Sequence, residues 1–160
     1  MAVDMFLDLE GIEGEARDKT HAKKIDILAW SWGMSQSGNM HIGGGGGAGK
    51  VHVQDISITK YVDRASTNVV KYCTLGTHIP KGEIIIRKAG GTAVEYLKIQ
   101  LTDIIVTSWS TGGSGGEDRL TENLTLQFAE FNIDYVGQDA KGAPVPKMSA
   151  SYNMAENATG

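Results

Sequence analysis

The fold is decided by the stretch LTLQFAEFNIDY, residues 124–135. Apolar residues take the even positions up to Phe128 and the odd positions from Phe131 onward. Because side chains alternate between the two faces of a strand, this change would turn the second half of the apolar set to the opposite face. Either a β-bulge near Ala129-Glu130 restores the pattern, or the strand bends from one sheet into another. Both alternatives predict a curved, closed β-structure.

β-type patterns continue through the rest of the chain. We expect further strands at residues 4–9, 25–34, 51–61, 83–87, 94–101 and 104–109, with a tight turn at Thr102-Asp103. Trp30 and Trp32 share one face of the second of these strands, where their rings can be buried. The predicted fold class is therefore mainly β: a compact β-barrel of two packed antiparallel sheets with one short α-helix.

The single predicted helix covers residues 67–75. Ser66 is a suitable N-cap and Gly76 can take the left-handed position that ends a helix. Val69, Val70 and Cys73 share one face, so we expect a packed thiol and not a reactive one.

Length and charge exclude several classes of protein. The chain has 160 residues, a net charge of −4 and one cysteine, so we expect a single domain without an internal disulfide. Neither a secretory signal nor an apolar run of about 20 residues is visible, and no basic cluster is large enough for nucleic acid. We place the domain at residues 1–136 and treat residues 137–160 as a polar, loop-like, poorly ordered tail.

Two glycine-rich runs, residues 43–49 and 112–116, contain tempting motifs. Gly44, Gly49 and Lys50 match most of a phosphate-binding loop, but Val51 replaces the Ser or Thr and a strand pattern follows. Residues 112–116 match the nucleophile elbow GxSxG around Ser114, but a strand pattern follows here too and no His occurs after His78. Nucleotide binding and hydrolysis are therefore disfavoured.

The remaining candidates do not form a catalytic or metal-binding set. The four histidines lack zinc-ligand spacing. Glu117, Asp118 and Glu122 are interpreted as solvated loop charges, although an acid–base pair is an alternative. Trp30 and Trp32 are interpreted as packing residues, although a ligand-stacking platform is an alternative. We expect no enzyme activity, no cofactor and no metal.

Several segments, in order from Met1 to about Tyr135, resemble the Hcp family of type VI secretion proteins. They are Gly14-Glu15 with Asp18 and His21, residues 25–33 (IDILAWSWG), Thr59-Lys60-Tyr61 with Asp63, residues 110–116 (STGGSGG), and Thr121-Glu122-Asn123-Leu124. The resemblance does not extend past Gly137.

This resemblance implies a β-barrel that assembles with copies of itself into a hexameric ring. Rings would stack into a tube with a spike protein at its tip, driven out of the cell by a contractile sheath, and the lumen would hold small effector proteins. The protein would be cytoplasmic before firing and then secreted without a signal peptide, with no membrane insertion.

The resemblance also implies where the contacts lie. By analogy with the family, the loop around Ser114 is expected to lie near the lumen, where small side chains would leave room for cargo; the candidate residues are Ser110, Thr111 and Ser114. A projecting glycine-rich loop, residues 38–50, is predicted to contact another ring or subunit, because glycine permits close backbone approach. Its candidate residues are Gly38, His41, Gly43, Gly46, Gly49 and Lys50.

Overall fold

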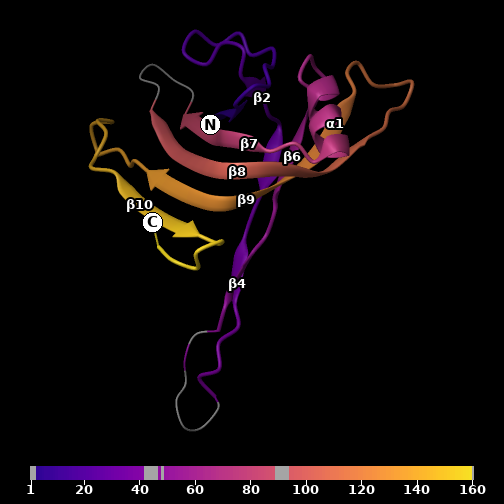
Figure 1. Ribbon diagram of the computed structural model, residues 1–160. Coiled ribbons are helices and arrows are strands. Elements are labelled where there is room, and N and C mark those ends of the chain that lie inside the picture. Colours follow the sequence, from indigo (N-terminus) through magenta and orange to yellow (C-terminus); the bar gives the residue numbers. More distant parts are fainter. Residues whose placement is uncertain (1–2, 42–46, 48, 89–93, 160) are drawn as a thin grey trace.

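The computed structural model describes residues 3–41, 47, 49–88 and 94–159. Its elements, shown in Figure 1, are β1 (Val3–Leu9), β2 (Ile25–Asp26), β3 (Ala29–Ser31), β4 (Met34–Gln36), β5 (Val51–Val53), β6 (Ile56–Tyr61), α1 (Ser66–Leu75), β7 (Ile79–Lys88), β8 (Glu95–Thr111), β9 (Thr121–Tyr135) and β10 (Met148–Asn153). The predicted mainly β fold with one short helix is confirmed.

The main sheet curls until its two edges are joined by one segment of chain. The strand order is β2-β1-β7-β8-β9-β6-β3, all described pairings are antiparallel, and β10 adds to β9. Between β2 and β3, Ile27 N donates to Met5 O (3.2 Å) on β1, and Leu28 N donates to Thr59 O (2.8 Å) on β6. Residues 25–31 therefore close the barrel. The second sheet is the small β4–β5 hairpin.

The alternation change in β9 is part of a bend that crosses three strands. Ile79, Ile104 and Phe128 pair in one row, and Gly82, Leu101 and Phe131 pair in a second row three residues away. Strict alternation would place these rows on opposite faces, yet both contain buried side chains. The sheet therefore bends between the rows.

Asp103, at the bend, has a left-handed φ of 53°. The prediction of a tight turn at Thr102-Asp103 is wrong, because β8 continues through these residues. A bulge at Ala129-Glu130 is also wrong, because the β8–β9 register is constant there and shifts between Val106 and Ser108. The second alternative is right that the strand bends, but the bend lies within one continuous sheet and does not pass from one sheet into another.

Two strands predicted as continuous are interrupted where the hairpin leaves the barrel. At this point Gln54 N donates to Gly33 O (3.0 Å), and Trp32 Nε1 donates to Gln54 O (2.8 Å). The Trp32 ring meets Phe131 edge-on with the ring centres 4.9 Å apart. Beyond this root, β4 and β5 extend away from the body (Figure 1).

Helix α1 begins one residue earlier than predicted. Ala65 occupies the N-cap without a side-chain hydrogen bond, so the prediction that Ser66 caps the helix is wrong. Gly76 is left-handed (φ 63°), as predicted, and its N–H donates to Tyr72 O. Val69 is fully buried, and Cys73 packs half-buried against the core.

The C-terminal region contains a strand that the sequence analysis missed. β10 pairs with β9 from Met148–Tyr135 to Asn153–Glu130. Ser149 Oγ donates to the buried Asp134 (2.5 Å), and this hydrogen bond lowers the pKa of that carboxyl. The loop-like reading of residues 137–160 is therefore wrong for Met148–Asn153. Alternating Ser and Ala at residues 149–151 gave too weak an apolar pattern for a strand to be predicted.

Candidate assembly and cargo surfaces

Small uncharged residues form two rows across the outer face of β3, β6, β9 and β8. One row contains Ala29, Thr59, Asn123 and Ser110, and the other contains Ser31, Ser57, Thr125 and Ser108. Thr59 Oγ1 donates to Asn123 Oδ1 (2.7 Å). We call these eight residues the small polar face. Ser110, predicted to contact cargo, belongs to it.

The register shift in β8 enlarges the hydroxyl surface next to this face. Thr107 and Ser108 are both exposed opposite Thr125, and their hydroxyls lie 2.7 and 2.6 Å from Thr125 Oγ1. Thr107 Oγ1 also donates to Asp55 Oδ2 (2.7 Å), just after the hairpin returns to the barrel. The bulge thus ties the hairpin root to the small polar face.

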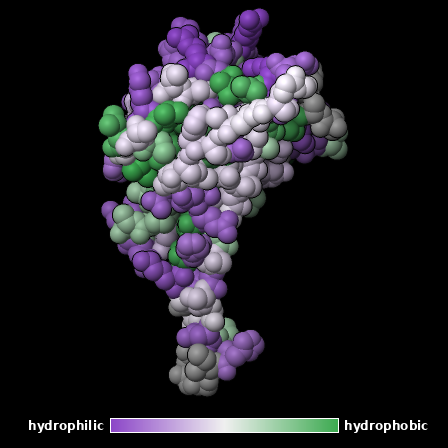
Figure 2. Space-filling view, turned by 90° about the vertical axis from the view of Figure 1, so that its right-hand side faces the viewer, coloured by the Kyte–Doolittle hydropathy of each residue, from purple (hydrophilic) through white to green (hydrophobic). Residues whose placement is uncertain are grey.

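The β8–β9 loop, residues 112–120, is exposed and connects two strands. Ser114 lies on this loop, and Thr111 lies at the end of β8, where its Oγ1 donates to Thr121 O (2.8 Å). Figure 2 views the molecule from this side and shows a broad near-white area of intermediate hydropathy across the body. A strand on each side of Ser114 is the arrangement that the sequence predicted, and it is not the strand-turn-helix of a nucleophile elbow.

A buried ionic cluster lies at the base of that loop. Lys60 and Glu122 are both fully buried and form an ion pair, and Lys60 Nζ also contacts Asp63 Oδ1 (2.8 Å). Glu122 accepts hydrogen bonds from Ser66 Oγ (2.7 Å) and Trp109 Nε1 (2.8 Å). These five residues, the Lys60 cluster, join β6, α1, β8 and β9.

The interpretation of Glu122 as a solvated charge is therefore wrong. The sequence did indicate that both charged residues occupy buried positions of their strands. Lys60 continues the alternation of buried Ile56 and Ile58, and Glu122 precedes buried Leu124 and Leu126 in the same alternation. Charged residues are rarely fully buried unless they are paired, so this position in the alternation implied a buried partner. The pairing itself was not visible, since 62 positions separate the two residues.

A second polar cluster fixes the segment that precedes β2. Arg87 pairs with Asp18 (2.5 Å) and Asp4 (3.0 Å), and the guanidinium lowers the pKa of the Asp18 carboxyl. Buried His21 contacts Glu95 Oε1 through Nε2 (2.5 Å) and Lys24 Nζ through Nδ1 (2.9 Å). The two ring nitrogens of His21 therefore link Glu95 to Lys24.

The hairpin places the predicted ring-contact residues away from the body. Four of them are exposed: Gly38, His41, Gly49 and Lys50. The other two, Gly43 and Gly46, lie outside the described residues. Gly49 packs against Ser37, and a side chain there would collide with it. Residues 33–54 contain no carboxylate.

The described residues contain no cluster of three or more His, Cys, Asp or Glu side chains able to hold a metal ion. Trp30 and Trp32 pack against the core, as the packing interpretation predicted. Within the same described ranges, helices are too short or too polar to span a membrane.

A curled antiparallel β-sheet with a projecting hairpin, a small polar face and a buried Lys60–Glu122 ion pair defines a small β-barrel protein. Comparison with known proteins then gives the family. The model of the type VI secretion system effector family Hcp matches residues 6–135, and the chain belongs to this family.

Relatives agree along nearly the whole chain. Protein hcp1 of Pseudomonas aeruginosa strain PAO1 is 61% identical over 144 residues, 89% of each chain. A solved type six secretion system protein superposes with a TM-score of 0.94 at 27% identity, covering 99% of this chain and 100% of that one. Hcp1 from Salmonella typhimurium gives a TM-score of 0.82 at 35% identity, covering 99% of both chains.

Proposed function

We propose that this chain is the structural subunit of a type VI secretion tube. Six copies form a ring, rings stack, and the lumen carries and protects small effector proteins. The observation that carries the proposal is the asymmetry of the barrel, which projects a hairpin from only one end (Figure 1). Unlike patches that fit each other generate rings when the rotation closes and filaments when it does not.

The small polar face, with Thr111 and Ser114 beside it, is proposed to line the lumen. Charge-assisted hydrogen bonds are about twice as strong as neutral ones, so a wall of Ser, Thr and Asn attaches cargo weakly enough to release it. The neutral composition of both rows supports this role.

The outer part of the hairpin is proposed to contact the next ring or a neighbouring subunit. An isolated two-stranded hairpin is marginally stable in water, so β4–β5 gains from a partner. Gly38, His41, Gly49 and Lys50 belong to this surface, and Gly43 and Gly46 are assigned to it from sequence alone.

The remaining partners follow from the family. They are the spike protein at the tip, the contractile sheath and small effector proteins, with no nucleic acid and no membrane insertion. We assign no enzyme activity; the protein is cytoplasmic before firing and is then secreted.

Sedimentation of the purified protein tests this function. The expected species has about six times the chain mass of 17.1 kDa, and negative-stain images are expected to show rings with a central hole. A monomer throughout the micromolar range, with isolated globules in the images, would contradict the proposal.

A further inference from the structure

The inward side of the β6–β9 ladder is apolar except at one pair of residues. Lys60 lies directly opposite Glu122, and both side chains are fully buried. The pairs before and after them in the same alternation are apolar: Ile56–Leu126, Ile58–Leu124 and, just past the strand ends, Val62–Leu120. The ion pair therefore interrupts an otherwise apolar run on both strands.

The apolar pairs alone fix the register of this ladder only weakly. Because side chains repeat with period two, sliding β6 by two residues along β9 keeps every inward side chain inward. Ile56 would then face Phe128 and Ile58 would face Leu126, so both pairs would again be apolar. Cores tolerate such exchanges when the apolar pattern is kept.

The ion pair distinguishes the two registers. After the slip, Lys60 would face Leu124 and would lose its carboxylate partner, and a buried charge without a partner is strongly destabilising. Glu122 would also be separated from Ser66 Oγ, which donates to it (2.7 Å) in the observed register.

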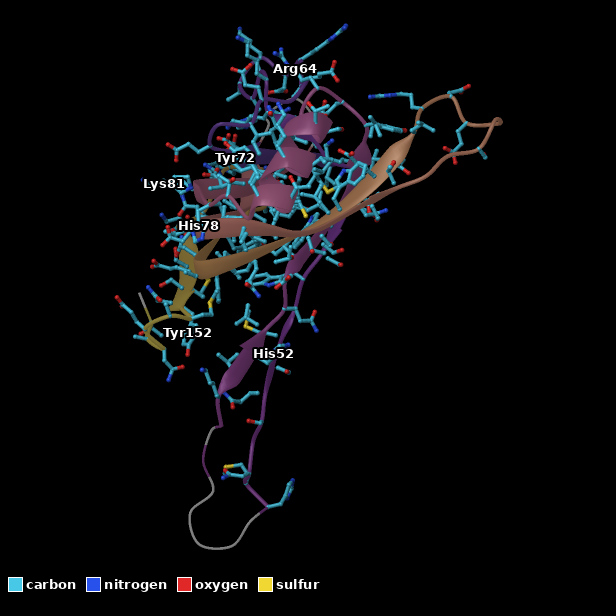
Figure 3. The ribbon with its side chains drawn as sticks, turned by 45° about the vertical axis from the view of Figure 1, so that its right-hand side comes forward. His52, Arg64, Tyr72, His78, Lys81 and Tyr152 are labelled. Atoms are coloured by element: carbon cyan, nitrogen blue, oxygen red, sulfur yellow. The ribbon has the colours of Figure 1, made fainter. Side chains whose placement is uncertain are left out.

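The Lys60 cluster also ties this register to the start of α1. Asp63 Oδ1 accepts a hydrogen bond from Ala65 N (2.9 Å) and contacts Lys60 Nζ (2.8 Å), and Ser66 is the first residue of the helix. In Figure 3, Arg64 lies at the end of α1 where the helix begins. A slipped β6 would therefore have to displace the helix start as well.

The register matters on the outer side of the ladder, where the small polar face lies. Thr59 is opposite Asn123 there, and Thr59 Oγ1 donates to Asn123 Oδ1 (2.7 Å). After a two-residue slip, Tyr61 would take the place of Thr59 opposite Asn123. A phenol ring would then stand in a row of small side chains.

We propose that the buried Lys60–Glu122 pair is a positioning device, which fixes the register of β6 on β9 and thereby the alignment of the small polar face. Specifying one alignment among several apolar alternatives is the best-attested use of buried polar groups. The register lock is a property of the single chain. Only its consequence for cargo rests on the function proposed above.

Disulfide trapping within one chain distinguishes the registers. In a Cys73→Ser background, Thr59→Cys/Asn123→Cys reports the observed register, and Thr59→Cys/Thr125→Cys reports the slipped one. Directly opposite residues bring their Cβ atoms close to the separation that a disulfide needs, whereas diagonal neighbours lie farther apart. Each protein is refolded from urea and oxidised, and its disulfide-bonded fraction is measured by thiol labelling and intact mass.

Both reporters are combined with the apolar variant Lys60→Met/Glu122→Leu. The matched control is Ile58→Leu/Leu124→Ile, which changes the neighbouring inward pair and keeps the ion pair. In wild type and control, the slipped reporter should crosslink at least about tenfold less than the observed-register reporter. In the apolar variant, we expect comparable yields from the two reporters.

An apolar variant that folds and crosslinks only in the observed register would overturn the proposal, as would equal crosslinking of both reporters in wild type. If the apolar variant does not fold, Glu122→Leu/Leu124→Glu decides, because its carboxylate faces Lys60 only after the slip. The slipped reporter should then give the stronger crosslink, and a stronger observed-register crosslink or a failure to fold would overturn the proposal. A wild-type monomer in sedimentation would overturn the tube function and leave the register lock standing.

Discussion

The barrel body and the hairpin differ in their charged side chains and in the number of strands that support them. In the body, Lys60 and Glu122 are fully buried and paired within the chain. In the hairpin, residues 33–54 contain no carboxylate, and β4–β5 forms a sheet of only two strands. The body is therefore stabilised by pairing within the chain, whereas the hairpin is proposed to gain from a partner. Stability should depend on the first region and assembly on the second.

The largest expected effect is in the Lys60 cluster. Lys60→Met leaves Glu122 buried without a cation, and removing one partner of a buried ion pair costs about 3–5 kcal/mol. Urea unfolding measures this loss of free energy. The double variant Lys60→Met/Glu122→Leu should recover most of it, since an apolar pair of similar volume is tolerated. A Lys60→Met protein as stable as the exposed-helix control Lys71→Met would show that the cluster contributes little.

A smaller loss is expected from overpacking at Gly14. A Cβ at this position would lie 2.5 Å from Lys24 O and 2.8 Å from Ile25 Cα, both backbone atoms. Gly14→Ala should therefore cost about 1–3 kcal/mol in the free energy of unfolding. Gly38, on the hairpin, has no atom within 4 Å of such a Cβ, so Gly38→Ala should leave stability unchanged. Equal effects at the two positions would remove the distinction between the regions.

Lowering the pH tests the stability that the Asp18–Arg87 pair contributes to the body. Arg87 holds the pKa of Asp18 below its ordinary value, so this pair stabilises the fold fully above the unfolded pKa of about 3.9. The contribution is lost as the pH falls from there through the folded pKa. The stabilities of wild type and Asp18→Asn should differ at pH 7, and the difference should shrink progressively as the pH falls below about 3.9.

The exposed Asp118→Asn variant controls for the loss of a negative charge. A difference between wild type and Asp18→Asn that stays constant down to the lowest pH would contradict the role of the pair.

The smallest effect on stability is expected at Ser114. Ser114→Gln lies on the exposed β8–β9 loop, so the free energy of unfolding should change by less than about 0.5 kcal/mol. Ring formation should remain intact, while co-purification of lumen cargo weakens because the longer side chain occupies its space. A variant that no longer forms rings would show that Ser114 lies at a subunit contact.

The signature segments recognised in the sequence prove to be structural in the body. Glu15 accepts a hydrogen bond from Arg64 N (3.1 Å), Asp18 pairs with Arg87, and Thr59 bonds Asn123. Their order along the chain was enough to indicate the family. Their partners were not predictable, because each lies on a strand or turn that only the closed barrel brings near.

Local pattern by itself determined the β class, the single helix with Gly76 at its end, and the change of face in residues 124–135. These features depend on side-chain alternation and on backbone preferences of neighbouring residues. The tertiary structure decided that the change of face is a bend shared by β7, β8 and β9, that Glu122 is buried, and that β10 exists. Each of these depends on pairing between distant strands, and the free energy of such pairing is absent from any short stretch of sequence.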